Sequence, residues 1–411
     1  MTAPLIQSIL EDRLYIAQGV DTLPTTGIFR AFRPDEAVHY HPLCDDFGPL
    51  NLNSLIEFVQ QLDQELSDHP TSRVFFLVEE GRRQLTNAVF LLGSYMLLRL
   101  DVQLDEVVEN FRWADNETEG YRDATFSEPT FRLSLADCWR GLAKGMQVGW
   151  LSFPKPESPW LWGEIDMEQY VHYDDPLNGD LHEVVPGKLV AFKGPHELGG
   201  KEYQDNDNGF RNFSASYYAE VLHDLGVELV ARLNEPEYDA AALRKKEIEV
   251  LDLFFEDCTA PPPRVAAAFL AAVERTGGAV AVHCKAGLGR TGTLIALHLM
   301  RRHGFTAREA MGWLRIMRPG SVIGEQQHFL CAVDEALRKP GAMAGWDDAS
   351  LPADSDAAAA AWRDGGAAAL ERSLAALGFG GSGGAAGAEA GRLAREVAAG
   401  MERRGSLRVR A

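Results

Sequence analysis

Cys284 and Arg290 are the two residues whose types and spacing point most directly to chemistry. Cys284 follows an apolar run at 279–282 with the composition of a buried strand, and Arg290 opens a helical pattern after a loop that contains Gly287. Backbone N–H groups gathered at the start of a helix bind anions, and the same field stabilises a thiolate. An arginine can also bond two phosphate oxygens at once. The arrangement therefore predicts a nucleophilic thiolate facing a bound phosphate.

The predicted phosphate-binding loop joins the end of that strand to the start of that helix. Its members are His283, Cys284, Lys285, Ala286, Gly287, Leu288, Gly289 and Arg290. We expect His283 to orient the loop through its ring nitrogens rather than to act as a base. We expect Thr291 to donate its hydroxyl to the departing sulfur, a role that is compatible with capping the helix.

A mechanism through a phosphocysteine also needs an acid that protonates the leaving oxygen. The segment 250–261 offers a strand followed by an acidic loop, upstream of the nucleophile. Asp257 is the predicted acid, Glu256 is the neighbouring alternative, and Asp252 lies within the apolar alternation of the strand. In a chain without the Cys284 loop, Asp257 would be interpreted as the start of a turn.

Gln326 and Gln327 are candidates for placing the water that hydrolyses the phosphocysteine, because a side-chain amide orients water without competing as a nucleophile. Taken alone, two glutamines would be a solvated helix start. The predicted site needs no metal and no cofactor, since Arg290 and the loop amides neutralise the phosphate charge. The eleven histidines also lack a metal-ligand spacing such as His-Glu-x-x-His.

Composition narrows the class of protein. The chain has 411 residues, enough for two or three domains, and a formal net charge of −20, which argues against nucleic acid and membrane surfaces as partners. Five cysteines without a Cys-x-x-Cys pair fit a reducing compartment, and Cys44, Cys138 and Cys331 are expected in the core. Without a signal-peptide pattern or a bilayer-length apolar run, the sequence predicts a soluble intracellular protein.

The pattern of apolar residues divides the chain into three regions: 1–183, 184–339 and 340–411. In the second region strands alternate with helices, which predicts an α/β fold with a parallel or mixed sheet covered by helices. The helices are expected at 216–225, 262–275, 292–303, 307–315 and 324–337. The polar segment 197–212 is an expected exposed insertion. The third region is rich in alanine and glycine and is predicted to be largely disordered.

A possible internal repeat connects the first two regions. In the first region a strand candidate at 74–78 precedes a helical pattern at 85–100, and an ungapped alignment of Val78 with Val282 sets Glu80 against Cys284. A carboxylate there would repel phosphate, so this alignment predicts a duplicated domain whose first copy has lost its active site. The alternative is that any two strand–turn–helix units look alike.

Taken together, these motifs resemble one family. Segments 283–293 (HCKAGLGRTGT), 318–327 (RPGSVIGEQQ), 253–261 (LFFEDCTAP) and 186–196 (PGKLVAFKGPH) are similar to the cell division cycle fourteen dual-specificity phosphatases, the mitotic-exit phosphatases. Segments 121–124 and 138–149 resemble the first domain of that family. The resemblance implies two tandem dual-specificity-phosphatase-like domains, each a central mixed sheet flanked by helices, with a flexible C-terminal tail. The first domain would be non-catalytic and would contribute to substrate specificity.

The resemblance also implies the substrates: phosphoserine, phosphothreonine and phosphotyrosine in proteins, with phosphoserine-proline at cyclin-dependent-kinase sites preferred. A basic residue after the proline would bind an acidic groove between the domains, for which Asp174, Asp175 and Asp180 are the candidates; the alternative is an ordinary solvated loop. Leu177 stands where the family usually has an acid, and Cys258 where it usually has a glycine. The implied locations are nucleus and cytoplasm, with centrosome, spindle or cilium resting on the resemblance alone.

Three other functions stay open on the sequence, one of them a tyrosine-specific phosphatase. An inositol-lipid phosphatase shares a His-Cys-Lys-Ala-Gly loop but usually carries a second lysine where this chain has Leu288. A non-catalytic phosphoprotein-binding scaffold would need neither the Cys284 nucleophile nor the Asp257 acid.

Overall fold

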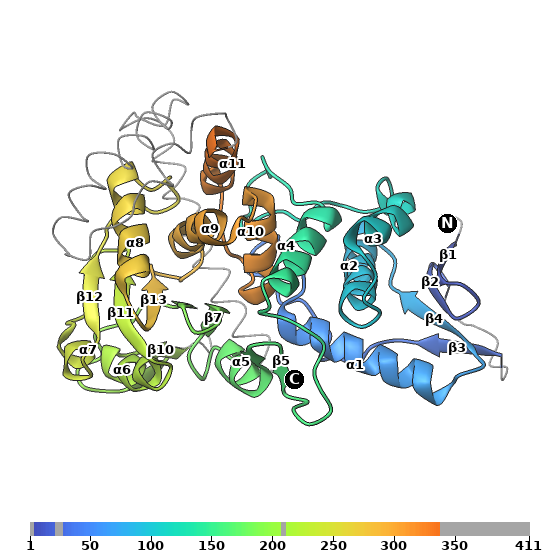
Figure 1. The fold of residues 1–411 in the computed structure, drawn as a ribbon, viewed down its shortest axis with the longest axis horizontal. Helices are drawn as coiled ribbons and strands as arrows, with labels where there is room; N and C mark the ends of the chain where they lie inside the picture. Colours follow the sequence, from blue (N-terminus) through green and yellow to red (C-terminus); the bar gives the residue numbers. More distant parts are fainter. Residues whose placement is uncertain (1–3, 21–27, 207–210, 338–411) are drawn as a thin grey trace.

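The computed structural model describes residues 4–20, 28–206 and 211–337. Two large sheets organise these residues, and Figure 1 shows them towards opposite ends of the long axis, with helices between them. Helices flank both sheets, as the α/β prediction requires.

The first sheet has four strands in the order β1-β2-β4-β3. They are β1 (Leu5–Leu10), β2 (Leu14–Gln18), β3 (Phe29–Phe32) and β4 (Arg73–Val78). β1 runs antiparallel to β2, whereas β4 lies parallel to both of its neighbours. The predicted strand at 74–78 is therefore an inner strand of this sheet.

The helices of the first half are α1 (Leu52–Asp68), α2 (Arg82–Leu98), α3 (Leu104–Asn110), α4 (Leu135–Gln147) and α5 (Met167–Asp174), with a 3-10 turn η1 (Arg112–Ala114). A short ribbon of β5 (Leu161–Trp162) and β6 (Ile165–Asp166) precedes α5. Most residues of α2 are buried, so apolar side chains occur around the helix rather than along one stripe.

The second sheet has five strands in the order β12-β11-β13-β8-β7. They are β7 (Leu181–Val185), β8 (Leu189–Phe192), β11 (Val227–Arg232), β12 (Glu249–Asp252) and β13 (Ala279–His283). Only the β7–β8 pair is antiparallel among the pairs of this sheet. The sequence-based boundary between 183 and 184 falls inside β7, so the second half begins earlier than predicted, before Leu181.

The helices of the second half are α6 (Ala215–Asp224), α7 (Ala241–Lys245), α8 (Pro263–Arg275), α9 (Gly289–His303), α10 (Ala307–Met317) and α11 (Glu325–Leu337). Helix α9 starts three residues before the predicted residue 292. Arg290 and Thr291 therefore lie in its first turn, where backbone N–H groups lack partners within the helix.

The two sheets share a topology, which supports the predicted duplication. In each, an antiparallel hairpin (β1–β2 or β7–β8) stands beside a central strand (β4 or β13) that is parallel to its neighbours and is followed by a buried helix (α2 or α9). Strand β3 then corresponds to β11, while β12 has no counterpart in the first sheet. The loop between β4 and α2 is also shorter than that between β13 and α9. Within the described residues, the first half thus lacks both the strand before the acidic loop and the longer phosphate-binding loop.

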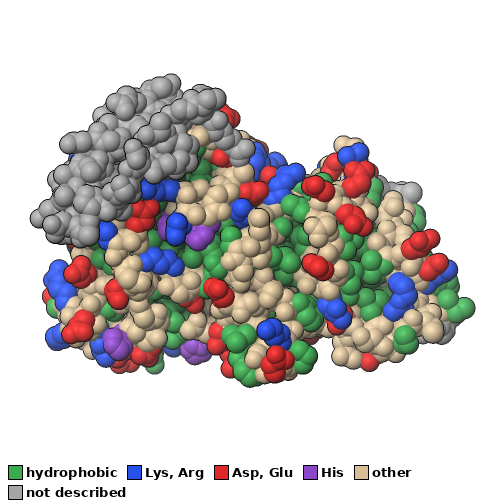
Figure 2. All heavy atoms as spheres, viewed as in Figure 1, with side chains coloured by type: hydrophobic (Ala, Val, Ile, Leu, Met, Phe, Trp, Pro, Cys, Tyr) green, Lys and Arg blue, Asp and Glu red, His purple; other side chains and the backbone are tan. Residues whose placement is uncertain are grey.

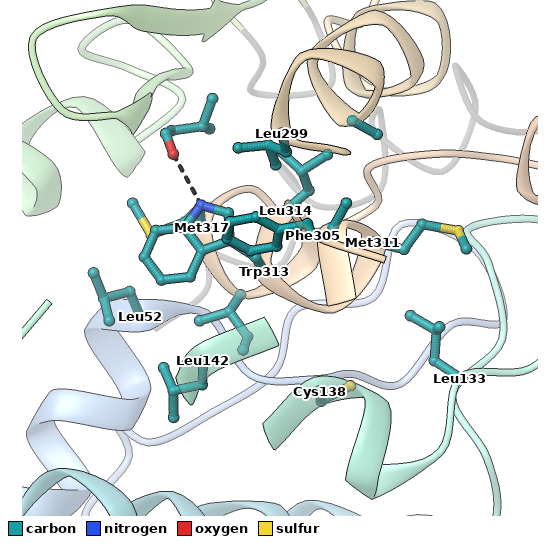
Figure 3. Packing of buried hydrophobic residues seen from close by; sticks show 14 of the residues in the cluster. Leu52, Leu133, Cys138, Leu142, Leu299, Phe305, Met311, Trp313, Leu314 and Met317 are labelled. Atoms are coloured by element: carbon teal, nitrogen blue, oxygen red, sulfur yellow. Dashed lines mark hydrogen bonds between the residues drawn. The ribbon is translucent and has the colours of Figure 1, made fainter. Parts of the chain in front are cut away.

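Helices α4 and α10 join the halves by a close crossing. A Cβ added to Gly141 would lie 2.5 Å from the carbonyl oxygen of Glu309, and one added to Gly312 would lie 2.7 Å from that of Asp137. Only glycine permits this approach. Beside the crossing, Trp313 is fully buried and donates from Nε1 to the carbonyl oxygen of Val184 at 2.9 Å, the dashed line in Figure 3.

The core is continuous across the halves. Figure 3 shows Trp313 of α10 surrounded by apolar side chains from both, among them Leu52 and Leu142 from the first half and Leu299 from the second. A mutation at this junction therefore affects the packing of both sheets.

The insertion predicted at 197–212 contains β9 (Tyr203–Asp205), which is exposed as expected, and its end overlaps the paired strand β10 (Arg211–Phe213). The region 340–411 lies outside the described residues.

Over the face drawn in Figure 2, acidic and basic side chains are interspersed among apolar ones.

Candidate active site

The loop that carries Cys284 links two buried elements of the second half. Strand β13 is buried throughout, Cys284 follows it with only 3% of its surface exposed, and α9 begins at Gly289. Gly287 has φ +69°, and a Cβ there would lie 2.0 Å from the carbonyl oxygen of Phe192. The loop can take this path only with glycine at that position.

Four hydrogen bonds fix the backbone orientation of residues 284–287 in the loop. The four consecutive carbonyl oxygens of residues 284–287 each accept a hydrogen bond. The donors are His283 Nδ1 to Cys284 at 2.9 Å, Gly194 N to Lys285 at 3.1 Å, Arg318 Nη2 to Ala286 at 3.1 Å and Arg318 Nε to Gly287 at 2.8 Å. Because N–H and C=O point in opposite directions across a planar peptide, the following amides turn to the other side. Such a set of amides at a helix start is an anion-binding cradle.

His283 has the orienting geometry that the sequence predicts. Its Nδ1 lies against a carbonyl oxygen, which can only accept, so Nδ1 carries the hydrogen and Nε2 accepts from Tyr238 Oη at 2.9 Å. Burial lowers the pKa of His283 to about 4. The ring is therefore neutral at physiological pH. Tyr238 was not singled out from the sequence, where an isolated tyrosine between strands carries no signal.

Arg290 and Asp257 meet across the site. Arg290 Nε lies 3.1 Å from Asp257 Oδ1, and Arg290 Nη1 donates to the carbonyl oxygen of Phe255 at 3.0 Å. Asp252 is instead held by Arg232 through two bonds of 2.6 and 3.1 Å. Of the three carboxylates considered from the sequence, Asp257 is thus the one that the structure brings to the arginine.

Two polar atoms in the first turn of α9 have no hydrogen-bond partner among the residues that the structure describes. They are Arg290 Nε, whose contact with Asp257 is not aligned as a hydrogen bond, and Thr291 Oγ1. Both side chains are buried, and buried polar atoms are normally satisfied. An anion in the cradle would satisfy the arginine donor. The predicted bond from Thr291 to the sulfur is not formed here and stays a prediction.

Gln326 and Gln327 lie in different surroundings. Gln326 Nε2 donates to the carbonyl oxygen of Thr259, in the acidic loop, at 3.2 Å, and a Cβ on Gly289 would lie 2.9 Å from Gln326 Oε1. Gln327 Oε1 accepts from Arg315 Nη2 at 2.6 Å. Gln326 therefore sits between the acidic loop and the phosphate-binding loop, whereas Gln327 pairs with a buried arginine.

Cys258 adopts a backbone conformation that favours glycine, the residue that the resemblance implies at this position. Its φ is +57°, in the left-handed region, and its amide donates to Asp257 Oδ1 at 3.0 Å. Burial raises the pKa of the Cys258 thiol to about 12. None of the five cysteines, all of which are among the described residues, is in a disulfide; Cys138 is buried as expected, and Cys44 and Cys331 are half-buried.

The three candidates for the acidic groove lie in different surroundings. Asp174 and Asp180 are each 6% exposed and have buried partners: Asp174 Oδ1 accepts from His182 Nε2 at 2.9 Å, and Asp180 Oδ1 lies 3.0 Å from Arg318 Nη1. Both carboxylates are therefore engaged inside the protein, and the acidic groove stays a prediction. Asp175 is half-buried, and its Oδ1 accepts from the amide of Leu177 at 2.9 Å.

The first half also reaches the site. Asp123 Oδ2 accepts from the amide of Gly324 at 2.7 Å, just before the helix that carries Gln326. Segment 121–124 was noted in the sequence only for its resemblance to the family, and Asp123 was given no role.

Among the residues that the structure describes, no three or more His, Cys, Asp or Glu side chains gather as a metal site. No helix within the described ranges combines the length and apolar character needed to cross a bilayer.

A parallel strand, a cysteine-bearing cradle and an arginine in the next helix define the class of cysteine-dependent phosphatases. Two family models agree. "Dual specificity protein phosphatase, N-terminal half" matches residues 8–145, and "Dual specificity phosphatase, catalytic domain" matches residues 213–336.

Similar sequences of named proteins identify the family within this class of phosphatases. The dual specificity protein phosphatase CDC14A of Mus musculus is 37% identical over 324 residues, 78% of this chain and 51% of that protein. The tyrosine-protein phosphatase cdc-14 of Caenorhabditis elegans is 37% identical over 302 residues, 71% of this chain and 40% of that protein. The chain belongs to the CDC14 family of dual-specificity phosphatases. It spans about half the length of the mammalian relative.

Among solved structures, the crystal structure of Tk-PTP in the active form matches with a TM-score of 0.31 and 26% identity, covering 38% of this chain and 96% of that one.

Proposed function

We propose that this protein hydrolyses phosphate monoesters on other proteins through a phosphocysteine. The observation that carries the proposal is the pairing of a cysteine with a cradle of inward-turned amides and a buried arginine nitrogen that lacks a hydrogen-bond partner within the described residues. A thiolate nucleophile, an anion site and an acid then occupy one place, which is what phosphoryl transfer to sulfur needs.

The proposed reaction has two steps. The thiolate of Cys284 attacks phosphorus, the P–S bond forms as the P–O bond to the substrate breaks, and Asp257 protonates the leaving oxygen. Asp257 then takes a proton from a water held by Gln326, the water oxygen attacks phosphorus, and the P–S bond breaks to release phosphate and the thiolate. One water is consumed, and Arg290 bonds the phosphate oxygens in both steps.

The proposed substrates are proteins with phosphoserine followed by proline and a downstream basic residue, with phosphothreonine and phosphotyrosine as further substrates. The support is the dual-specificity name of the relatives and the acidic character of segment 174–180. With Asp174 and Asp180 engaged in buried pairs, Asp175 is the carboxylate that we assign to the basic residue. A role in cell-cycle control and a location in nucleus and cytoplasm belong to the same proposal, and imaging a tagged chain through division tests both.

Steady-state hydrolysis of matched peptides tests the function. The panel contains phosphoserine-proline with and without a downstream lysine, phosphothreonine-proline, phosphotyrosine and a soluble phosphoinositide. Preference for phosphoserine-proline with lysine, reduced by Asp175→Asn, supports the proposal. Preference for the phosphoinositide would move the assignment to a lipid phosphatase, and binding of phosphopeptides without turnover would make the protein a scaffold.

Two variants test the roles of the site residues. Cys284→Ser should bind phosphopeptide but not turn over, and full residual turnover would exclude Cys284 as the nucleophile. Asp257→Asn should slow alkyl phosphates more than aryl phosphates, because a serine oxygen leaves poorly without a proton. Equal losses on the two substrates would count against Asp257 as the acid.

A further inference from the structure

A chain of hydrogen bonds connects the phosphate-binding loop to the first half of the protein. Arg318, which holds the carbonyl oxygens of Ala286 and Gly287, also has Nη1 2.9 Å from His182 Nδ1. His182 Nε2 lies 2.9 Å from Asp174 Oδ1, and the other carboxylate oxygen of Asp174 accepts from Asn51 Nδ2 at 3.0 Å. Asn51 is the N-cap residue of α1.

The donors and acceptors in this chain have one consistent order. A guanidinium can only donate, so His182 Nδ1 accepts and Nε2 carries the hydrogen that Asp174 accepts. Both oxygens of Asp174 are then engaged, one by each half of the protein. Arg318, His182 and Asp174 are all at least nine-tenths buried, so water cannot readily replace a lost partner.

Stability alone does not account for this arrangement. A buried ionic chain adds little net free energy compared with apolar packing, whereas a buried chain that is left incomplete is costly. This chain ends on two of the carbonyl oxygens whose outward orientation creates the anion cradle.

We infer that Asn51 is a positioning residue for phosphate binding: through Asp174, His182 and Arg318, the first half holds the phosphate-binding loop of the second half in its anion-binding conformation. The inference rests on the proposed function, since it assigns a role to the loop that binds phosphate. Asn51 itself has no contact with substrate in this scheme and acts only through the other three side chains.

The test uses the two hydrogen-bonding functions of Asn51. Its Oδ1 caps α1 by accepting from the amide of Ser54 at 3.0 Å, while its Nδ2 reaches Asp174. Aspartate and serine are both strong N-caps, so Asn51→Asp and Asn51→Ser keep the cap and lose the bond to Asp174. Asn51→Asp also sets two carboxylates against each other.

A double variant supplies the rescue. In Asn51→Asp with Asp174→Asn the two side-chain types are exchanged. The amide nitrogen of the new residue 174 then donates to the carboxylate at 51, and its amide oxygen accepts from His182 Nε2. The bond between residues 51 and 174, the bond between residue 174 and His182, and the net charge are restored.

The readouts in the full chain are the binding of orthovanadate, which needs no turnover, and kcat and KM for p-nitrophenyl phosphate, which has no basic residue for an acidic groove. We expect Asn51→Asp to weaken orthovanadate binding by about tenfold, the worth of one hydrogen bond to a charged group, with KM rising in parallel. Asn51→Ser should have a smaller effect in the same direction, and the double variant should recover most of the affinity. The melting temperatures of the variants should stay close to that of the wild type, so that the loss of orthovanadate affinity cannot be attributed to unfolding.

A matched control is Ser134→Ala, which removes the N-cap of α4, a helix of the first half that does not belong to this chain of bonds. It should lower the melting temperature and leave orthovanadate binding unchanged. The inference is overturned if Asn51→Asp binds orthovanadate like the wild type, or if the double variant binds no better than Asn51→Asp. Failure of the wild type both to bind orthovanadate and to turn over would instead reject the proposed function.

Discussion

Leu288 of the phosphate-binding loop packs against Leu43 of the first half. The two side chains belong to one small buried cluster with Ala124 and Ile323, and only 2% of Leu288 is exposed. This is the position at which the sequence analysis expects a lysine in an inositol-lipid phosphatase. In this fold the first half covers the position, so no charged side chain can project from it towards a ring phosphate.

Leu288→Lys should therefore destabilise the protein without conferring activity on phosphoinositides. Burying an ammonium shifts its pKa by several units, which corresponds to about 3–5 kcal/mol in the free energy of unfolding. Leu288→Met, which conserves volume, should cost less than about 1.5 kcal/mol. Denaturant unfolding and a phosphoinositide hydrolysis assay measure the two effects. A stable, lipid-hydrolysing Leu288→Lys protein would show that the first half does not close this position.

Replacing each glutamine by alanine should separate Gln326 from Gln327. Gln326→Ala removes the amide between the two loops, so hydrolysis of the phosphocysteine should slow by about tenfold or more, seen as a larger burst of the released alcohol in rapid-quench experiments. Gln327→Ala removes the side-chain oxygen that accepts from Arg315 Nη2, which then keeps only its bond to the carbonyl oxygen of Val322. Because this arginine is buried, the variant should lower the free energy of unfolding by about 1–3 kcal/mol. A larger burst in Gln327→Ala than in Gln326→Ala would reverse this assignment.

Cys258→Gly should change stability by less than about 1 kcal/mol, because two effects of similar size oppose each other. Glycine relieves a left-handed conformation that costs other residues roughly 1–2 kcal/mol, and the variant loses the packing of a buried thiol. Cys258→Val, which is β-branched at the same φ, should destabilise by more than about 2 kcal/mol. Thermal unfolding of the two variants and their rates on an aryl phosphate provide the measurement. Equal stability of the two would mean that the backbone relaxes and the strain is absent.

The sequence predicted the parts of the site that lie close together in the chain. Cys284, Gly287 and Arg290 fall within one strand–loop–helix unit, whose apolar run and glycine spacing carry the signal locally. Local patterns also predicted the α/β alternation and the repeat of a strand–loop–helix unit, aligned at Val78 and Val282. The matching strand order of the two sheets supports these two predictions. The hairpin of β1 and β2 was missed. β1 alternates half-buried and exposed residues over only six positions, and β2 is a mostly buried strand of five residues, so neither carries a long pattern.

Side-chain partners far apart in the chain could not be predicted. Tyr238 bonds His283, Arg318 bonds the loop carbonyls, and Asp123 bonds Gly324 across 201 positions, and none of these residue types is unusual where it stands. The same limit applies to Asp174, whose buried partner His182 could not be predicted from the sequence.

The buried imidazole of His283 should make the protein less stable in mild acid. Burial lowers its pKa from 6.5 to about 4 in the folded state, so between these values the unfolded chain takes up a proton that the folded protein does not. Stability linked to this group is therefore complete above pH 6.5 and falls as the pH drops towards 4. At pH 5 the loss amounts to about 2 kcal/mol.

Denaturant unfolding at pH 7.5 and pH 5 measures this contribution. His283→Asn removes the titrating ring, so its stability should fall by about 2 kcal/mol less between the two pH values than that of the wild type, whatever its stability at pH 7.5. Other groups, including His182, whose pKa is also lowered by burial, contribute equally to both proteins. His172→Asn, which removes an exposed ring, should show the wild-type difference. If His283→Asn and the wild type lose the same free energy, then His283 is already protonated in the folded protein, and the neutral tautomer that bonds Tyr238 and Cys284 is wrong.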